Sequence, residues 1–282
     1  MTIAVTGATG QLGQRVIEHL KARAGDEEII ALARTPEKAE GLGVTARAFD
    51  YDQADALADA LEGVDTLLLI SGSEVGKRAP QHRNVIVAAK AAGVGRIVYT
   101  SLLRADTSPL SLAPEHLETE AMIRESGIPF TLLRNGWYAE NHAASIPTAV
   151  QLGALYGAAG EGRISWATRD DFAEAAAVVL TAEGQEGKVY ELAGDNGHTL
   201  TELAGDISGQ TGKAIPYTDL PEADYAAALS QAGLPEPWPQ ALASFDAKAA
   251  DGALYNDGND LSKLIGRPTT PLSEIVAAGL RG

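Results

Sequence analysis

The chain has 282 residues, of which 45% are hydrophobic, and carries a formal net charge of −16 at pH 7. Its length and apolar content allow a large buried core, built as one extended domain or as a large domain with a small annex. The acidic balance argues against a nucleic acid partner, because phosphate binding needs a basic surface. The absence of cysteine excludes disulfides and thiolate chemistry.

The chain begins with a predicted strand at residues 2–5, which is apolar and rich in β-branched residues. Three glycines follow, Gly7, Gly10 and Gly13, and apolar residues then recur at helical spacing up to Leu20. A strand, glycine turn and helix direct free backbone N–H groups and the positive end of the helix dipole at one point, which attracts phosphate. Glycine also allows a pyrophosphate to approach closely. An ordinary strand-to-helix turn is the alternative.

The second predicted strand, residues 27–34, ends at Arg34. In a dinucleotide-binding fold, the residue about 20 positions after the glycines contacts the adenosine ribose. An acidic side chain there would bind a free 2′-hydroxyl, whereas the fork of an arginine binds a 2′-phosphate. The sequence therefore predicts NADP(H) rather than NAD(H), the alternative being a solvated arginine in the loop 34–39.

Strand and helix patterns then alternate up to residue 134. Strands are predicted at 44–49, 65–71, 96–101 and 129–134, and helices at 50–63, 78–93 and 113–127. Continuously apolar strands are typical of a parallel sheet covered on both faces, which predicts an α/β, Rossmann-type doubly wound sheet. Its ligand crevice is expected at the carboxyl ends of the strands. The residues at those ends are Gly7, Arg34, Asp50, Ser71, Thr100 and Asn135.

The pattern changes after residue 142. A short strand is predicted at 188–194 and helices at 199–212, 220–235 and 271–280, with a proline-rich turn at 234–240. Thr199 and Glu202 form a capping-box pattern at the start of the first of these helices. We therefore expect a first domain over residues 1–142 and a smaller, mostly helical C-terminal lobe over 143–282, with substrate between them.

Five strings of the chain together resemble one protein family: "TGATGQLG", "LLLISGSEVGKRAPQHRNVIVAAKAAGV", "IVYTSLL", "FTLLRNGWYAEN" and "LSKLIGRPTTPL". They are similar to the NmrA-like branch of atypical short-chain dehydrogenases/reductases, and within it to the bacterial NADPH:quinone oxidoreductase 2 group, with triphenylmethane reductase a relative. Together with Asp50 at its strand end, the resemblance implies an NADP(H) site made by Gly7, Ala8, Thr9, Gly10, Gln11, Leu12, Arg34, Asp50, Ser71, Gly72, Ser73, Asn135, Gly136, Trp137, Tyr138, Ala139 and Glu140.

The helix predicted at 113–127 departs from the usual short-chain reductase pattern. Such reductases carry a tyrosine and a lysine four apart on this helix, where the lysine helps the phenol to donate a proton. This chain has His116 and Glu120 at that spacing, and the carboxylate is expected to favour a charged imidazole. His116 is thus the candidate catalytic and substrate-contacting residue. The alternative is a solvent-facing histidine paired with Glu120.

The resemblance implies direct, flavin-free hydride transfer from NADPH to a quinone. This reaction tolerates the loss of the tyrosine, because the product anion is phenolate-like and weakly basic. Trp137 and Tyr138 are the expected substrate contacts, stacking on a flat ring. Two alternatives stay open: a reductase of a dye-like or enone substrate, and an NADP(H)-binding redox sensor of the NmrA type.

The sequence bears on cellular location and on metal binding through features that it lacks. No signal peptide and no apolar run of about 18 residues is present, so a cytoplasmic protein without membrane insertion is expected. The five histidines are scattered without ligand spacing, so no metal site is predicted. The oligomeric state stays open, with a homodimer as one option.

Overall fold

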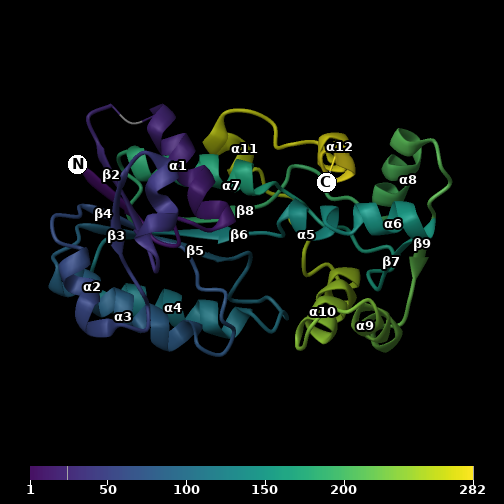
Figure 1. The fold of residues 1–282 in the computed structure, drawn as a ribbon, viewed down its shortest axis with the longest axis horizontal. Coiled ribbons are helices and arrows are strands. Elements are labelled where there is room, and N and C mark those ends of the chain that lie inside the picture. The colour runs from purple at the N-terminus through teal and green to yellow at the C-terminus, as the bar shows by residue number, and fades with distance from the viewer. Residues whose placement is uncertain (24, 282) are drawn as a thin grey trace.

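A computed structural model describes residues 1–23 and 25–281 of the chain. Its main sheet has seven strands in the order β3-β2-β1-β4-β5-β6-β8, and every neighbouring pair is parallel (Figure 1). The strands are β1 Thr2–Val5, β2 Glu28–Ala33, β3 Thr45–Ala48, β4 Thr66–Leu69, β5 Arg96–Leu102, β6 Phe130–Asn135 and β8 Val189–Leu192. The predicted doubly wound sheet is confirmed, and its strand order reverses between β1 and β4.

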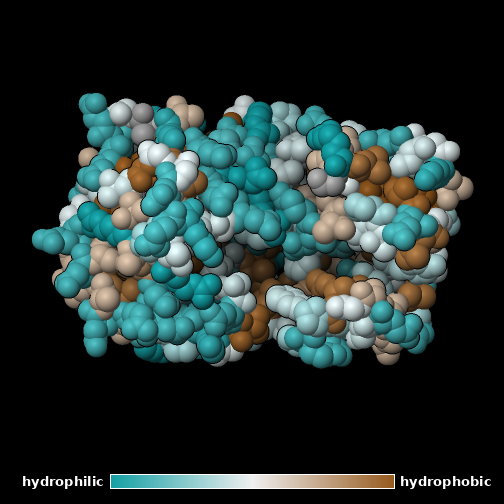
Figure 2. All heavy atoms as spheres, viewed as in Figure 1, coloured by the Kyte–Doolittle hydropathy of each residue, from teal (hydrophilic) through white to brown (hydrophobic). Residues whose placement is uncertain are grey.

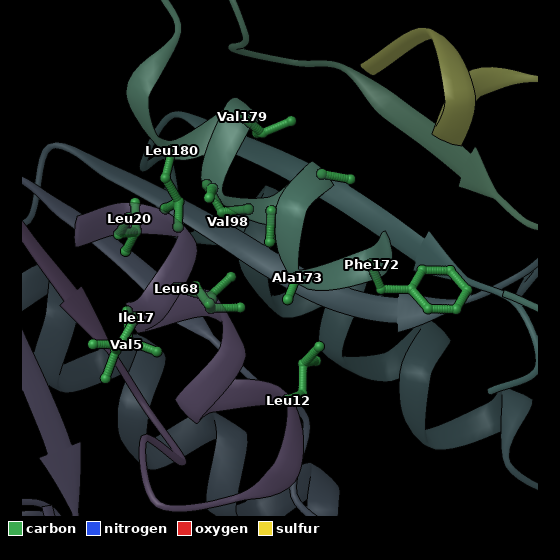
Figure 3. Packing of buried hydrophobic residues seen from close by; sticks show 14 of the residues in the cluster. Val5, Leu12, Ile17, Leu20, Leu68, Val98, Phe172, Ala173, Val179 and Leu180 are labelled. Atoms are coloured by element: carbon green, nitrogen blue, oxygen red, sulfur yellow. The ribbon is translucent and has the colours of Figure 1, made fainter. Parts of the chain in front are cut away.

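Helices cover both faces of this sheet (Figure 1). One face carries α1 Gln11–Arg23, α7 Arg169–Thr181 and α11 Asp260–Ile265, and the other carries α2 Ala54–Ala60, α3 Arg78–Ala91 and α4 Ala113–Ser126. Figure 3 shows the first of these layers, in which side chains of α1 and α7 meet those of β1, β4 and β5. The central strands are apolar at successive residues because both of their faces are buried.

The remaining elements form a lobe at the carboxyl edge of the sheet (Figure 1). They are α5 Ala139–Ala143, α6 Ile146–Leu152, β7 Leu155–Gly157, α8 Leu200–Thr211, β9 Tyr217–Asp219, α9 Glu222–Gln231, α10 Trp238–Ala250 and α12 Leu272–Arg281. The strands β7 and β9 pair in a small parallel sheet. A separate apolar core holds the lobe together. On the face shown in Figure 2, the surface is largely hydrophilic, and apolar residues line a depression between the two parts.

Several elements after residue 142 differ from the sequence-based expectation. The expected strand at 188–194 is present as β8, but it extends the main sheet next to β6, and α7 packs against α1. The boundary expected at residue 142 therefore does not coincide with the edge of the sheet. Residues 238–240, expected in a turn, begin α10. The capping box of Thr199 and Glu202 is confirmed.

The 3₁₀ helix η1 and the helix α7 are among the elements that the sequence did not predict. A 3₁₀ helix, η1 Pro36–Leu42, occupies much of the loop after Arg34. The helix α7 was missed because eight of its residues are buried, so its alanine-rich sequence shows no single apolar stripe. None of the helices in residues 1–23 and 25–281 is long and apolar enough to cross a membrane.

Candidate functional site

The glycine turn lies between β1 and α1, at the carboxyl edge of the main sheet. Gly7 has a φ of +57°, in the left-handed region that favours glycine. A Cβ on Gly13 would lie 2.3 Å from the carbonyl oxygen of Gly7, so the helix can approach the turn only with glycine there. The first turn of α1 has no acidic residue. Turn and helix thus form a cradle of backbone N–H groups that fits a pyrophosphate.

Arg34 follows β2, and its side chain is 71% exposed. Its Nη1 lies 3.6 Å from Oε1 of Glu74, which belongs to the loop after β4. Because β2 and β4 flank β1, this ion pair spans the carboxyl end of β1. Asp50 follows β3, and its Oδ1 accepts a hydrogen bond of 3.1 Å from the N–H of Asp52. Because the guanidinium of Arg34 is exposed, it can bind a phosphate group in place of Glu74.

In the segment 71–73, after β4, side chains of β5 and α3 bind the backbone of Ser71 and Gly72. The Ser71 N–H donates to Oγ1 of Thr100 at 2.9 Å. The Gly72 carbonyl accepts from Nε of Arg78 at 2.9 Å, and the Gly72 N–H donates to Nε2 of His82 at 3.0 Å. Both backbone polar groups of Gly72 are thus bound by side chains of the same helix, α3, which fixes this loop over the carboxyl edge of the sheet.

The proton of His82 can be assigned from its partners. The Thr119 hydroxyl donates to the Glu115 carbonyl at 2.8 Å, so Oγ1 of Thr119 accepts from Nδ1–H of His82 at 2.9 Å. Nε2 is then free to accept from Gly72. Burial, with the nearby charge of Arg78, lowers the pKa of His82 to about 3, which keeps the imidazole neutral. Sequence reasoning missed His82, because nothing near it in the chain marks its role.

His116 lies on α4 and is 5% exposed. Its Nδ1 is 2.8 Å from the hydroxyl of Tyr99, and burial, followed by the charge of Arg78, lowers its pKa to about 3. The expectation that His116 carries a charge is therefore wrong, and so is the alternative that it faces solvent. Burial by the elements packed around α4 lowers the pKa of His116, and the Glu120 carboxylate one turn away does not offset this effect.

The carboxylate of Glu120 has a different partner from the one expected. Its oxygens lie 2.9 and 2.8 Å from Nε and Nη2 of Arg134, on β6, in a two-pronged ion pair. Oε1 also accepts a hydrogen bond of 2.6 Å from the Ser101 hydroxyl. Arg134 further reaches Glu191 at 2.8 Å and Asp106 at 3.1 Å. The Glu120 carboxylate thus forms a buried ion pair with Arg134, and not a pair with His116.

Asn135 ends β6 and is 5% exposed. Its Nδ2 donates to the hydroxyl of Tyr138 at 3.3 Å, while its Oδ1 is buried without a hydrogen-bond partner among the described residues. A buried amide oxygen needs a donor. A nicotinamide or a ribose supplies such donors, so the end of β6 fits the second half of a dinucleotide.

The segment after Asn135 is anchored mostly by protein contacts. Gly136 and Ala139 carry no polar side chain, so they can contribute only through their backbone. A Cβ on Gly136 would lie 3.0 Å from the carbonyl oxygen of Leu192. Trp137 is 8% exposed, and its ring packs edge-on against Phe245, with ring centres 5.3 Å apart. Little of its surface is therefore open to a ligand.

Tyr138 and Glu140 both contact Arg169, at the start of α7. The guanidinium lies 4.4 Å from the centre of the Tyr138 ring. Both Glu140 oxygens bind the same residue, one the backbone N–H at 2.9 Å and the other Nη1 at 3.1 Å. The Glu140 carboxylate is committed to this contact, which leaves it a role in holding α5 against α7.

These loops converge at the carboxyl edge of the main sheet, beside the reversal of strand order at β1 and β4. In open α/β sheets, ligands bind at this point. No group of histidine, aspartate or glutamate side chains in the described part of the chain is arranged to hold a metal ion. Fold and site together define a dinucleotide-binding α/β protein of the Rossmann type.

A family model described as NAD(P)H-binding matches residues 7–183, more than half of the chain. The chain belongs to this family, in its NmrA-like branch. It is 58% identical to quinone oxidoreductase 2 of Escherichia coli over 278 residues, which cover 98% of this chain and 97% of that protein. The resemblance noted in the sequence is thereby confirmed.

Two solved structures are similar over essentially their full length. The NADPH-dependent quinone oxidoreductase of Escherichia coli, complexed with NADPH, matches with a TM-score of 0.96 at 57% identity, covering 99% of this chain and all of that one. The triphenylmethane reductase of Citrobacter matches with a TM-score of 0.96 at 40% identity, with both chains fully covered. The lobe and the sheet therefore keep the same arrangement in a quinone reductase and in a dye reductase.

Proposed function

We propose that this protein is an NADPH-dependent quinone reductase that transfers hydride directly to a quinone, without a flavin. The observation that carries the proposal is the 58% identity to a quinone oxidoreductase over the whole chain. It is supported by loops that fit NADPH: the glycine cradle, the exposed Arg34 and the unpaired amide oxygen of Asn135. NADPH supplies the hydride when bound, and the residues of the chain hold and orient the two reactants.

Different loops at the carboxyl edge of the sheet bind different parts of NADPH. The cradle at Gly7–Leu12 receives the pyrophosphate, Arg34 the 2′-phosphate, and the segment from Ser71 to Ser73, held by Arg78 and His82, lies between them and β5. Positioning of this kind supplies much of the rate where the product is a weak base. Substrate enters between the sheet and the lobe, where the small exposed part of Trp137, together with Tyr138, contributes to the wall.

Water supplies the proton for the product. Reduction of a quinone by hydride gives a phenolate-type anion, which water can protonate. A general acid works best when its pKa is near the working pH. With a pKa of about 3, His116 is protonated in only roughly one molecule in 10⁴ at neutral pH, too few for an obligatory acid.

The test is oxidation of NADPH by purified protein with a panel of benzoquinones and naphthoquinones, followed through the absorbance of the reduced nicotinamide. A triphenylmethane dye and an enone belong in the panel, because the dye reductase shares this architecture at 40% identity. Turnover of dye or enone but not of quinone would overturn the quinone assignment. Tight NADPH binding without oxidation by any acceptor would favour the redox sensor.

We place the protein in the cytoplasm with a small quinone as its partner, and cell fractionation tests the location. Light scattering of the purified protein, with and without NADPH, would tell a monomer from a homodimer.

A further inference from the structure

One imidazole nitrogen in the lobe faces two tryptophans. Nδ1 of His142, on α5, accepts a hydrogen bond of 3.2 Å from the indole N–H of Trp137 and another of 3.0 Å from that of Trp166. An indole nitrogen is a donor only, so Nδ1 must carry a lone pair and no proton. The two indoles thus share a single acceptor, which fixes both rings relative to the imidazole.

The opposite nitrogen of His142 faces a carboxylate. Nε2 lies 3.4 Å from Oδ1 of Asp246 on α10, and Oδ2 of Asp246 accepts from the Ala158 N–H at 3.1 Å. A neutral imidazole with Nδ1 as acceptor has its proton on Nε2, pointing at this carboxylate. Side chains of both residues are largely buried, at 15% and 7% exposure. Asp246 therefore selects the tautomer that the tryptophans require.

The four side chains come from three separate segments. Trp137 and His142 follow β6, Trp166 precedes α7, and Asp246 belongs to α10. Phe245, next to Asp246, packs edge-on against Trp137 with ring centres 5.3 Å apart. The helix α10 thus contacts both the imidazole and the indole. We call His142, Trp137, Trp166 and Asp246 the indole–imidazole node.

We propose that His142 is a positioning residue, which sets the indole of Trp137 at the wall of the quinone site through its unprotonated Nδ1. The inference rests on the proposed function, since only that function puts a quinone beside Trp137. His142 itself touches neither reactant. Its loss should raise the KM for quinone more than the NADPH dissociation constant, because the glycine turn and Arg34, which are assigned to the phosphates of NADPH, are not part of the node.

Nuclear magnetic resonance of the indole N–H groups tests the geometry directly. The chain has three tryptophans, and the third, Trp238, is 46% exposed. Two indole signals should exchange slowly with water and one rapidly. His142→Phe should shift and expose both slow signals, whereas His142→Asn keeps an acceptor oxygen near the position of Nδ1 and should restore part of the protection.

His198 offers a matched control within the same lobe. Its ring stacks on Trp166 at 6.5 Å, with an interplanar angle of 12°, and makes no hydrogen bond to the indole N–H. His198→Phe should therefore move the Trp166 signal only, with the Trp137 signal and the quinone KM unchanged.

Kinetics then test the role. We expect His142→Phe to raise the quinone KM about 3- to 10-fold, the scale of one net hydrogen bond, with a smaller change in kcat and partial rescue by His142→Asn. If His142→Phe does not fold, Asp246→Asn is the second variant: its amide N–H facing Nε2 would move the imidazole proton to Nδ1, against both indoles. It should give the same shifts and the same rise in KM.

The outcomes separate the two proposals. Folded variants with displaced indole signals and an unchanged quinone KM would overturn the positioning role, and so would indole signals that do not respond to His142. Wild-type protein that does not reduce quinones would overturn the proposed function instead, because the resonance experiment needs no substrate.

Discussion

Glu120 and Arg134 form a two-pronged ion pair, with oxygen–nitrogen distances of 2.9 and 2.8 Å and both side chains below 10% exposure. The pair joins α4 to β6 directly beneath the carboxyl edge of the sheet. At the position where short-chain reductases carry a lysine, this chain has a carboxylate that is already neutralised. The arrangement leaves His116 without a charged partner on its own helix, which is consistent with its low pKa.

Removal of one member of this pair should be costly. Arg134→Met leaves the Glu120 carboxylate buried beside an uncharged Ser101 hydroxyl, and we expect the free energy of unfolding to fall by about 3–5 kcal/mol. Urea denaturation measures it. Glu118→Gln, which removes an exposed pair with Arg83, is the control and should change stability by about 0.5 kcal/mol or less. The double variant Arg134→Met with Glu120→Gln should recover part of the loss, and equal stability of single and double variants would contradict the assignment.

The ion pair also shows where sequence reasoning reaches its limit. Spacing within one helix correctly brings His116 and Glu120 to the same face, but it cannot reveal Arg134, which arrives from a strand 14 residues later in the chain. The sequence could predict the glycine turn and Arg34, because neighbouring residues mark both of them. It could also predict that the strand ends meet, because this follows from the parallel order of the strands. His82 and His142 could not, since their roles depend on partners that meet only after folding.

Arg34 is expected to discriminate between the two nicotinamide cofactors. Arg34→Ala should weaken NADPH binding about 10- to 100-fold, the scale of hydrogen bonds to a charged group, and leave NADH binding nearly unchanged. Fluorescence titration of both cofactors gives the comparison. Arg83→Ala removes another exposed, ion-paired arginine outside the site and serves as the control. An equal loss for NADH and NADPH would remove the assignment of Arg34 to the 2′-phosphate.

Gly13 is expected to be intolerant of any side chain. The Cβ of Gly13→Ala would lie 2.3 Å from the Gly7 carbonyl oxygen and 2.8 Å from the Cα of Ala8, so the turn must move and the cradle open. NADPH affinity should fall at least about tenfold, as measured by calorimetry. Gly205→Ala, within α8 and with no atom within 4 Å of its Cβ, should instead stabilise the protein by about 0.5–1 kcal/mol. Normal NADPH binding by Gly13→Ala would place the pyrophosphate elsewhere.

The two buried histidines of α3 and α4 should make stability depend on pH. His82 and His116 have a pKa of about 3 in the folded protein, lowered from 6.5 mainly by burial. The unfolded chain therefore binds more protons between about pH 6.5 and 3, and stability falls as the pH is lowered through this window. Each histidine contributes a slope of roughly 1.4 kcal/mol per pH unit.

Urea denaturation at a series of pH values measures this dependence. The comparison is with the double variant His82→Gln and His116→Gln, in which the carboxylates still titrate as in the wild type. The wild-type curve should be the steeper of the two below pH 6.5. Parallel curves would mean that the histidines are protonated, or accessible, in the folded state.

The last prediction concerns proton delivery to the reduced quinone. With His116 neutral at working pH and the product a weak base, His116→Ala should lower kcat by less than about tenfold, well short of the roughly 10²- to 10⁴-fold loss that follows removal of an essential general acid. Because the substitution also leaves the buried Tyr99 hydroxyl without its partner, His116→Gln is measured beside it to separate stability from turnover. NADPH carrying deuterium at the transferred position should slow both variants and the wild type to the same extent, since hydride transfer is unaffected by the missing imidazole. A kcat that collapses in both variants would make His116 an obligatory acid, and would favour a carbonyl or enone substrate, whose alkoxide-like product needs one.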